Sequence, residues 1–441
     1  MNVNKIDKEV KILVFSVPSW NSKVGANSWA ALLESYPSRN IASVSIRDDI
    51  PDSPVCGRYF TISENRIIKS ILNRKIKTGY EVTTAAYAES LIDLSAQKRR
   101  YSRYQKRRNY LMLLVREMVW KLGKWKTKEF DSFLDDFQPD LILHSMDGYI
   151  HMNRIVKYAI QRTSAKAIGY IWDDNFTYNV SNSLGFKVYR YFQRRSLKSL
   201  AKITDNFFSI SERTKLEADA FFHIDSTVLT KPLNSIPKFE EKEYAPPYRI
   251  LYTGSLIIGR DETLKTLINI LEWINIDKLF FVLDIYTGTG LTEKDRDYFN
   301  KPYIQLHEAI PQSEILKKQQ ETDILLFLEA LSGSFVNSAR LSFSTKITDY
   351  LSCGKPILAI GNRNNCPIAY FIENDAALTA CDEMQIKKVL KEILSNPQIL
   401  NQYAENACAC GIRNHAPEKI MQTFNRVIEK TVGQRKELSN G

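Results

Sequence analysis

No stretch of this 441-residue sequence approaches the roughly 20 consecutive apolar residues that a membrane-spanning helix requires. The first residues, MNVNKIDKEVK, are polar and occupy the place where a secretory signal would have its apolar core. Cysteine is scarce: six are scattered along the chain, and Cys408 and Cys410 lack the CxxC spacing of metal and redox motifs. These absences argue against a membrane-spanning or a disulfide-rich secreted protein, and we expect a cytoplasmic protein with reduced thiols.

The composition also lacks the bias of disordered and collagen-like chains, because 44% of the residues are hydrophobic and 25% are charged. One hydrophobic core rarely serves more than about 250–300 residues. The length of the chain therefore predicts two folded domains.

Short apolar segments alternate with longer helical patterns in both halves of the chain. Their near-continuous apolar character predicts parallel strands covered by helices on both faces, and hence two doubly wound, Rossmann-like α/β domains. The strands are expected within residues 11–17, 42–46, 140–145, 166–172 and 206–211, and then within residues 249–256, 279–288, 303–310, 323–329 and 355–361.

Four prolines and a charge cluster interrupt this alternation and predict a linker at residues 232–247. The first domain then covers residues 1–231, and the second covers residues 248–412. A final helix, residues 413–441, is expected to pack back toward the first domain. Because ligands of doubly wound sheets bind beyond the carboxyl ends of the strands, we expect the chemistry in a cleft between the two domains.

The segment FSTKITDYLSCGKPILAIG, residues 343–361, combines a loop, a short helix, a glycine stop and a buried strand. Ser344 or Thr345 can cap the helix, and the first-turn amides then form an anion site close to Lys346. Asp349 lies one turn further along the same face of the helix. Its carboxylate can accept hydrogen bonds from sugar hydroxyls.

This segment resembles the nucleotide-sugar-binding segment of glycosyltransferases with the GT-B fold, especially those of family 4. In that family a Pro/Ser-Thr-Lys loop and a helix run into the sequence E-Y-L-A-x-G-K-P-V. The resemblance implies that Ser344, Thr345 and Lys346 lie near the donor diphosphate and that Asp349 holds the ribose of the nucleotide. Asp replaces the family's usual Glu at this position, which shortens the reach toward the ribose.

A second segment, RILYTGSLIIGRDETLKTLINIL, covers residues 249–271 and resembles the start of the nucleotide domain in the same family. In that family, a strand ends in a loop of small residues, which a basic residue and a helix follow. The resemblance implies that Gly254 and Ser255 let the backbone approach the donor phosphates. Arg260 would then offset their negative charge.

A third segment follows the first expected strand and resembles the family's loop that meets the transferred sugar or the donor phosphates. The residues that this resemblance assigns to the cleft are Lys23, Gly25 and Asn27. Gly25 equally suits a plain turn that permits a tight connection between a strand and a helix.

Carboxylates follow two of the strands expected in the first domain. Asp173 and Asp174 come directly after residues 166–172. One of them can act as a base or orient an acceptor hydroxyl while the other caps the next helix, and capping by both is the structural alternative. His144 and Asp147 end the preceding strand, and a lone histidine in such a place is more often structural.

One position departs from the family pattern. The family places a first acidic residue eight positions before Asp349, and this sequence has Leu341 there. Glu329, at the end of an expected strand, can take over the contact with the donor sugar, and the alternative is a surface charge at a strand end. The resemblance implies a retaining mechanism, although the sequence lacks that first acid.

The net charge of +11 is concentrated in one segment. Residues 98–128 contain twelve Lys or Arg and one Glu, which alone amounts to +11. Cationic and amphipathic aromatic side chains together favour a helix that lies on an anionic membrane surface, and a solvated helix over ordinary core leucines is the alternative. The residues expected to face the membrane are Arg99, Arg100, Arg107, Arg108, Trp120 and Trp125.

Together these features predict a glycosyltransferase that moves a sugar from a UDP- or GDP-type nucleotide sugar to a glycan or a polyprenyl-diphosphate-linked acceptor. The pathway would be surface polysaccharide biosynthesis at the inner face of the cell membrane. No metal or other cofactor is expected, since the family usually acts without one, and no nucleic-acid partner is expected, because no motif for one is present. The alternatives are a non-catalytic GT-B-like subunit that binds nucleotide sugar or glycan, and a sugar-nucleotide epimerase.

Overall fold

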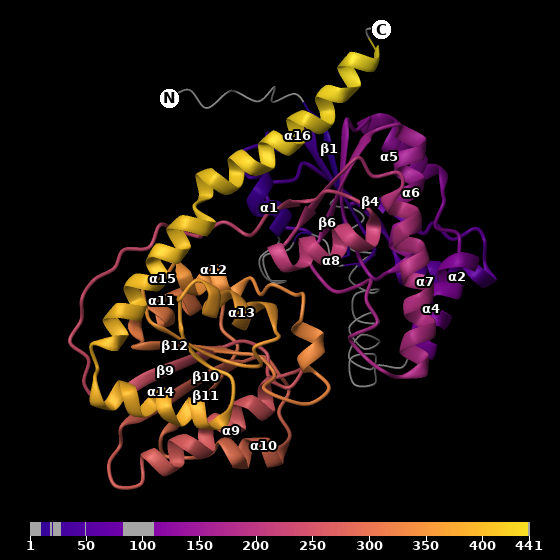
Figure 1. The fold of residues 1–441 in the computed structure, drawn as a ribbon. Coiled ribbons are helices and arrows are strands. Elements are labelled where there is room, and N and C mark those ends of the chain that lie inside the picture. Colours follow the sequence, from indigo (N-terminus) through magenta and orange to yellow (C-terminus); the bar gives the residue numbers. More distant parts are fainter. Residues whose placement is uncertain (1–9, 18–19, 21–27, 49, 83–109, 440–441) are drawn as a thin grey trace. The chain divides into compact units, whose positions relative to one another are not determined.

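The structure is a computed structural model, and it describes residues 10–17, 20, 28–48, 50–82 and 110–439. The chain divides into two compact units. The first unit consists of two segments, one that ends at Thr230 and one that begins at Met421. The second unit is Lys231–Ile420. Figure 1 shows that the strands of each unit lie in its interior with helices around them.

The first unit contains an eight-stranded sheet in the order β4-β3-β2-β1-β5-β6-β7-β8. The β3–β4 pair is antiparallel, and the other pairs are parallel. The strands are β1 (Ile12–Ser16), β2 (Ile41–Ser45), β3 (Arg58–Ile62), β4 (Gly79–Glu81), β5 (Leu141–Ser145), β6 (Lys166–Ile171), β7 (Asn206–Ser209) and β8 (Thr227–Val228). The helices are α1 (Ser28–Leu33), α2 (Glu64–Leu72), α4 (Tyr110–Leu122), α5 (Lys128–Phe137), α6 (Ile150–Thr163), α7 (Leu184–Ala201) and α8 (Glu212–Phe222).

The second unit contains a six-stranded parallel sheet in the order β11-β10-β9-β12-β13-β14. The strands are β9 (Tyr248–Thr253), β10 (Phe281–Thr287), β11 (Ile304–Glu308), β12 (Ile324–Leu328), β13 (Ile357–Ile360) and β14 (Leu378–Ala380). The helices are α9 (Arg260–Ile274), α10 (Glu293–Phe299), α11 (Gln312–Glu321), α12 (Lys346–Leu351), α13 (Cys366–Glu373), α14 (Glu383–Ser395), α15 (Ile399–His415) and α16 (Pro417–Ser439), of which α16 continues into the first unit.

The predicted fold class is confirmed, and all ten expected strands are present in these two sheets. Strands such as β5 and β12 are buried at every position, as strands with helices on both faces must be. The sequence does not predict β3, which mixes polar with apolar residues, or β4, β8 and β14, which have two or three residues each.

The helix expected over residues 413–441 corresponds to α16, and the preceding helix α15 extends a few residues into that range. α15 ends at His415 and α16 begins at Pro417, because proline has no amide to donate and disfavours helical geometry at Ala416 before it. Beyond the break, the Phe424 ring packs 6.5 Å from that of Tyr36 and 5.8 Å from that of Phe208, ring centre to ring centre, within the first unit. Across all the residues described, no helix is at once long and apolar enough to cross a bilayer.

Candidate functional site

The strand order of the second sheet reverses between β9 and β12. From β9 the chain adds β10 and β11 on one side, and β12, β13 and β14 then follow on the other. Ligands of open parallel sheets bind beyond the carboxyl ends of the strands at such a reversal. Gly254 and Ser255 follow β9 directly, Glu329 follows β12, and Lys346 begins α12. Both predicted nucleotide-binding segments therefore contribute residues to this edge of the sheet.

The ammonium group of Lys346 lies against the loop after β9. Its Nζ is 5.1 Å from the centre of the Tyr252 ring. Throughout the described part of the chain, no carboxylate forms an ion pair with it. Burial and, next, the positive charge of Arg260 lower the pKa of Lys346 to about 8. A lysine that forms no ion pair, and whose charge Glu329 and Asp349 offset only in part, is suited to an anionic ligand such as a phosphate group.

Gly254 makes room for this lysine. Its φ is 143°, which L side chains rarely adopt, and a Cβ at this position would lie 2.2 Å from Lys346 Nζ. The loop itself is held by the Gly254 amide, which donates to the Tyr286 carbonyl at 3.0 Å, and by the Tyr252 hydroxyl, which donates to the Ser255 carbonyl at 2.8 Å. The loop thus needs glycine for its backbone conformation, and the absent Cβ leaves room for the ammonium group where it lies.

Arg260, the first residue of α9, forms a two-point ion pair with Glu329. The Nη2–Oε1 distance is 2.8 Å and the Nε–Oε2 distance is 3.2 Å, while Nη1 lies 3.5 Å from Ser255 Oγ. The Glu329 backbone carbonyl also accepts a hydrogen bond from the Thr263 hydroxyl at 2.9 Å. Glu329 is 2% exposed, so the surface-charge alternative is wrong for this residue. Its carboxylate orients the guanidinium at the edge of the sheet.

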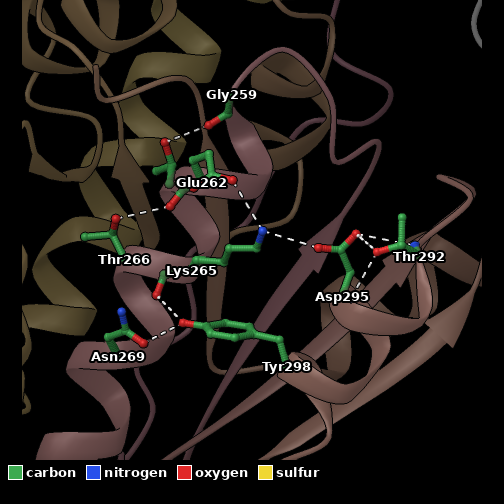
Figure 2. A network of polar contacts seen from close by, with 9 residues as sticks. Gly259, Glu262, Lys265, Thr266, Asn269, Thr292, Asp295 and Tyr298 are labelled. Atoms are coloured by element: carbon green, nitrogen blue, oxygen red, sulfur yellow. Dashed lines mark hydrogen bonds and ion pairs between the residues drawn. The ribbon is translucent and has the colours of Figure 1, made fainter. Parts of the chain in front are cut away.

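A polar network holds α9 against α10, one turn further along from Arg260 (Figure 2). Lys265 Nζ lies 3.3 Å from carboxylate oxygens of both Glu262 and Asp295. Asp295 completes a capping box with Thr292 at the start of α10, and the Tyr298 hydroxyl donates to the Lys265 carbonyl at 3.2 Å. The lysine of this network is fully paired, in contrast to Lys346.

The predicted side-chain cap on α12 is wrong. Thr345 occupies the N-cap position with helical angles, φ −61° and ψ −20°, and its side chain makes no capping hydrogen bond. Ser344 contributes its backbone carbonyl, which accepts from the Ile347 amide at 3.1 Å. Both residues still lie directly before Lys346, at the start of a helix of six residues.

Asp349 is already bound within the second unit. Its Oδ1 accepts a hydrogen bond from Lys231 Nζ at 2.5 Å and from Asn234 Nδ2 at 2.8 Å. The side chains of Lys231 and Asp349 are 7% and 11% exposed, so this is a largely buried ion pair. Leu341, at the position where the family has its first acid, is fully buried. Sequence patterns did not reveal the Lys231 contact, because the two residues are 118 positions apart.

The first sheet reverses its strand order between β1 and β5, and carboxylates follow β5 and β6. Trp172 Nε1 donates a hydrogen bond to Asp147 Oδ1 at 3.4 Å, and the Trp172 ring packs 4.7 Å from that of Tyr170. Burial raises the pKa of Asp147 to about 7, against the hydrogen bond from Trp172 and with a contribution from the charge of Asp173. A carboxyl group that titrates near neutral pH is suited to proton transfer.

The neighbouring residues divide into structural and exposed ones. Asp174 is buried, and its carboxylate accepts hydrogen bonds from the amide of Thr177, at 2.9 Å, and from the Thr177 hydroxyl. Asp174 therefore caps the turn that follows β6. Asp173 is exposed. His144 is fully buried with Nε2 3.1 Å from Thr204 Oγ1, and burial lowers its pKa to about 4, which agrees with the structural interpretation. The sequence favoured the Asp173–Asp174 pair and named Asp147 beside it, and Asp147 is the carboxyl group that contacts the Trp172 indole.

Some predicted residues lie outside the part of the chain that the structure describes: Lys23, Gly25, Asn27, Arg99, Arg100, Arg107 and Arg108. The prediction that Trp120 faces a membrane is wrong, because its side chain is 0% exposed and its ring stacks 4.5 Å from that of His151. Trp125 is partly buried, with its ring 5.6 Å from that of Tyr158.

Comparisons with known proteins bear on both units. Residues 285–426 match a family model described as glycosyl transferase-like, and no curated protein sequence matches the chain. The solved structure of Anabaena HepE in complex with UDP and glucose has a TM-score of 0.60 at 9% sequence identity and covers 96% of this chain and 100% of that one. Sucrose-phosphate synthase from Thermosynechococcus elongatus has a TM-score of 0.59 at 11% identity, covering 95% and 98% of the two chains.

The α,α-trehalose 6-phosphate synthase from Burkholderia multivorans is similar to the same degree, with a TM-score of 0.59 at 9% identity and 98% of each chain covered. Identities this low concern the fold, and these structures are glycosyltransferases of the GT-B class. The chain accordingly has the GT-B fold of two Rossmann-like domains, and its residues 285–426 are similar to the glycosyl transferase-like family model.

Proposed function

We propose that the protein is a glycosyltransferase that uses a UDP-sugar donor. The observation that carries this proposal is the unpaired ammonium group of Lys346, at the reversal of strand order in the second sheet and against the glycine loop after β9. UDP is the first candidate nucleotide because HepE, which shares the fold, forms a complex with UDP-glucose. The fold likeness of a Burkholderia vietnamiensis UDP-forming trehalose-phosphate synthase points the same way.

The donor site would bind the diphosphate of the nucleotide sugar. Lys346 and Arg260 supply positive charge, and Ser344, Thr345 and the backbone of Gly254 and Ser255 line the approach to it. As the bond between the sugar and the diphosphate breaks, negative charge grows on the leaving phosphate, and a preorganised cation stabilises that charge most strongly. Glu329 would serve by holding Arg260, at Nη2–Oε1 2.8 Å, and by facing the donor sugar.

The acceptor is proposed to be a glycan or a polyprenyl-diphosphate-linked glycan, in a cytoplasmic step of surface polysaccharide synthesis that retains the configuration of the sugar. Asp147 and Asp173 are the groups proposed to orient the acceptor hydroxyl. They follow β5 and β6 at the carboxyl edge of the first sheet, beside the partly exposed ring of Trp172. A half-buried indole next to a carboxyl group suits the apolar face and the hydroxyls of a sugar.

A second candidate is a GT-B-like subunit that binds nucleotide sugar without catalysing transfer. This candidate is favoured because two of the predicted acids already form ion pairs within the protein: Glu329 with Arg260, and Asp349 with Lys231. The buried Leu341 also leaves the family's first acid without a substitute at that position.

Nucleotide release separates these candidates. Purified protein is incubated with UDP-, GDP- and ADP-sugars, with and without a bacterial lipid extract, and released nucleoside diphosphate is measured by a coupled assay. We expect release of UDP that increases when the extract supplies an acceptor. Binding of UDP without release under any condition would favour the non-catalytic subunit, and failure to bind any of the nucleotides would refute the donor site.

The pKa of Lys346 predicts how UDP binding depends on pH. The free protein loses this proton as the pH rises through about 8, whereas a bound diphosphate favours the protonated form and so raises the pKa in the complex. UDP affinity should therefore be constant below pH 8 and fall above it, by up to about tenfold per pH unit until the pKa of the complex is reached. Calorimetric titrations at pH 7, 8 and 9 measure this. The terminal phosphate, with a pKa of roughly 6, stays ionised throughout.

The matched control for this titration is Lys346→Arg, whose guanidinium keeps its proton across the range. Its UDP affinity should not vary between pH 7 and pH 9. An equal decline in the wild type and in this variant would assign the pH dependence to another group.

A further inference from the structure

Helix α4 exposes an apolar stripe. Leu111, Val115, Met118 and Leu122 recur at the spacing of one helical face, and together with Met112 they are 42–65% exposed. The opposite face carries the buried Glu117 and Trp120. The helix is therefore packed on one side and apolar on the other, where a soluble surface helix would be polar.

Helix α7 repeats this arrangement beside α4. Leu184, Val188, Tyr191 and Phe192 are 41–78% exposed and share one face, while the other face is buried. The two helices are packed together, with the Tyr110 ring of α4 5.5 Å from that of Phe186 in α7. Figure 1 shows α4 and α7 side by side at the margin of the first unit. Leu72, the last residue of α2, which also packs on α4, is 94% exposed.

The charge on this surface has one sign. α7 contains five basic residues and no acidic one, and Lys187, Arg195 and Lys198 are exposed. α4 adds the exposed Lys121, and its one acid, Glu117, is buried against His151 at 2.8 Å.

We propose that the exposed faces of α4 and α7 dock on an anionic lipid bilayer. The apolar stripes would enter the boundary between headgroups and acyl chains, and the lysines and arginines would meet the anionic headgroups. A second copy of this chain is a poorer occupant, because it would bring two surfaces of the same positive charge together. Among the residues predicted to face the membrane, Trp120 lies in the core, and the docking face of α4 is a stripe of Leu, Val and Met instead. The proposal does not depend on the proposed transfer reaction.

The test is cosedimentation of the full chain with vesicles of neutral phosphatidylcholine, alone or with about 30% phosphatidylglycerol. The variant Leu111→Gln/Val115→Gln/Met118→Gln removes the α4 stripe. The matched control, Ile276→Gln/Met384→Gln/Ile412→Gln, changes three exposed apolar residues of the second unit. We expect the α4 variant to bind anionic vesicles at least tenfold more weakly than the wild type, and the control to bind as the wild type does.

A second variant, Lys187→Gln/Arg195→Gln, isolates the charge. It should weaken binding to anionic vesicles at about 0.1 M salt and have a smaller effect at about 0.5 M, where charges are screened. UDP affinity and circular dichroism, measured on all variants, report whether each unit remains folded. Undiminished vesicle binding by a folded α4 variant would overturn the proposal. The proposal would also be overturned if the wild-type protein does not bind vesicles but forms dimers, and the α4 variant does not form them. A second copy of the chain would then be the occupant.

Discussion

UDP should bind Lys346→Ala about 10- to 100-fold more weakly than the wild-type protein, because a charge-assisted hydrogen bond to phosphate contributes about 1.5–3 kcal/mol. No ion pair within the described residues depends on this ammonium group, so its removal leaves no carboxylate unpaired. The free energy of unfolding should accordingly change little. Isothermal calorimetry with UDP and thermal unfolding of the free protein measure the two quantities separately.

Lys265→Ala is the matched control for this variant. It removes a lysine from the same unit, but one whose charge is taken up by Glu262 and Asp295 at 3.3 Å each (Figure 2). Its UDP affinity should equal that of the wild type. If Lys346→Ala binds UDP as tightly as Lys265→Ala does, Lys346 is not part of the donor site.

The sequence was a good guide wherever one local pattern determines the outcome. Continuous apolar segments predicted ten strands, since a strand with helices on both faces has no polar side. Gly254 was singled out because its segment resembles the family's loop of small residues, and the structure gives it a φ of 143°, which favours glycine. The loop from Gly254 to Arg260 and the start of α12 were correctly paired by their order in the chain and come together at one sheet edge.

What the sequence could not predict are contacts between residues far apart in the chain. Glu329 pairs with Arg260, 69 positions away, so an acid considered for the donor sugar already holds the neighbouring cation. Trp120 lies in a basic, aromatic segment, and only the packing of α4 shows that its ring is stacked on His151 in the core. Burial of this kind depends on which face of a helix meets its neighbours, and composition carries no such information.

Asp349→Ala should lower the free energy of unfolding by about 3–5 kcal/mol, because it leaves Lys231 as a buried charge without its partner. Both side chains are largely buried, with the Lys231 Nζ–Asp349 Oδ1 distance at 2.5 Å, so solvent screens this pair little. The pair joins the first residue of the second unit to α12, the helix that Lys346 begins. Chemical denaturation of the wild type and the variant measures the difference.

The double variant Lys231→Met/Asp349→Leu tests the cause, because replacing both members of a buried ion pair by apolar residues is often close to neutral. It should recover most of the lost stability. If the single variant is as stable as the wild type, the ion pair is not what holds this carboxylate.

The double variant also tests the ribose role that the family resemblance implies for Asp349. Weaker binding of UDP with unchanged binding of inorganic diphosphate would assign Asp349 to the ribose, and equal binding of both would make it a purely structural anchor of α12.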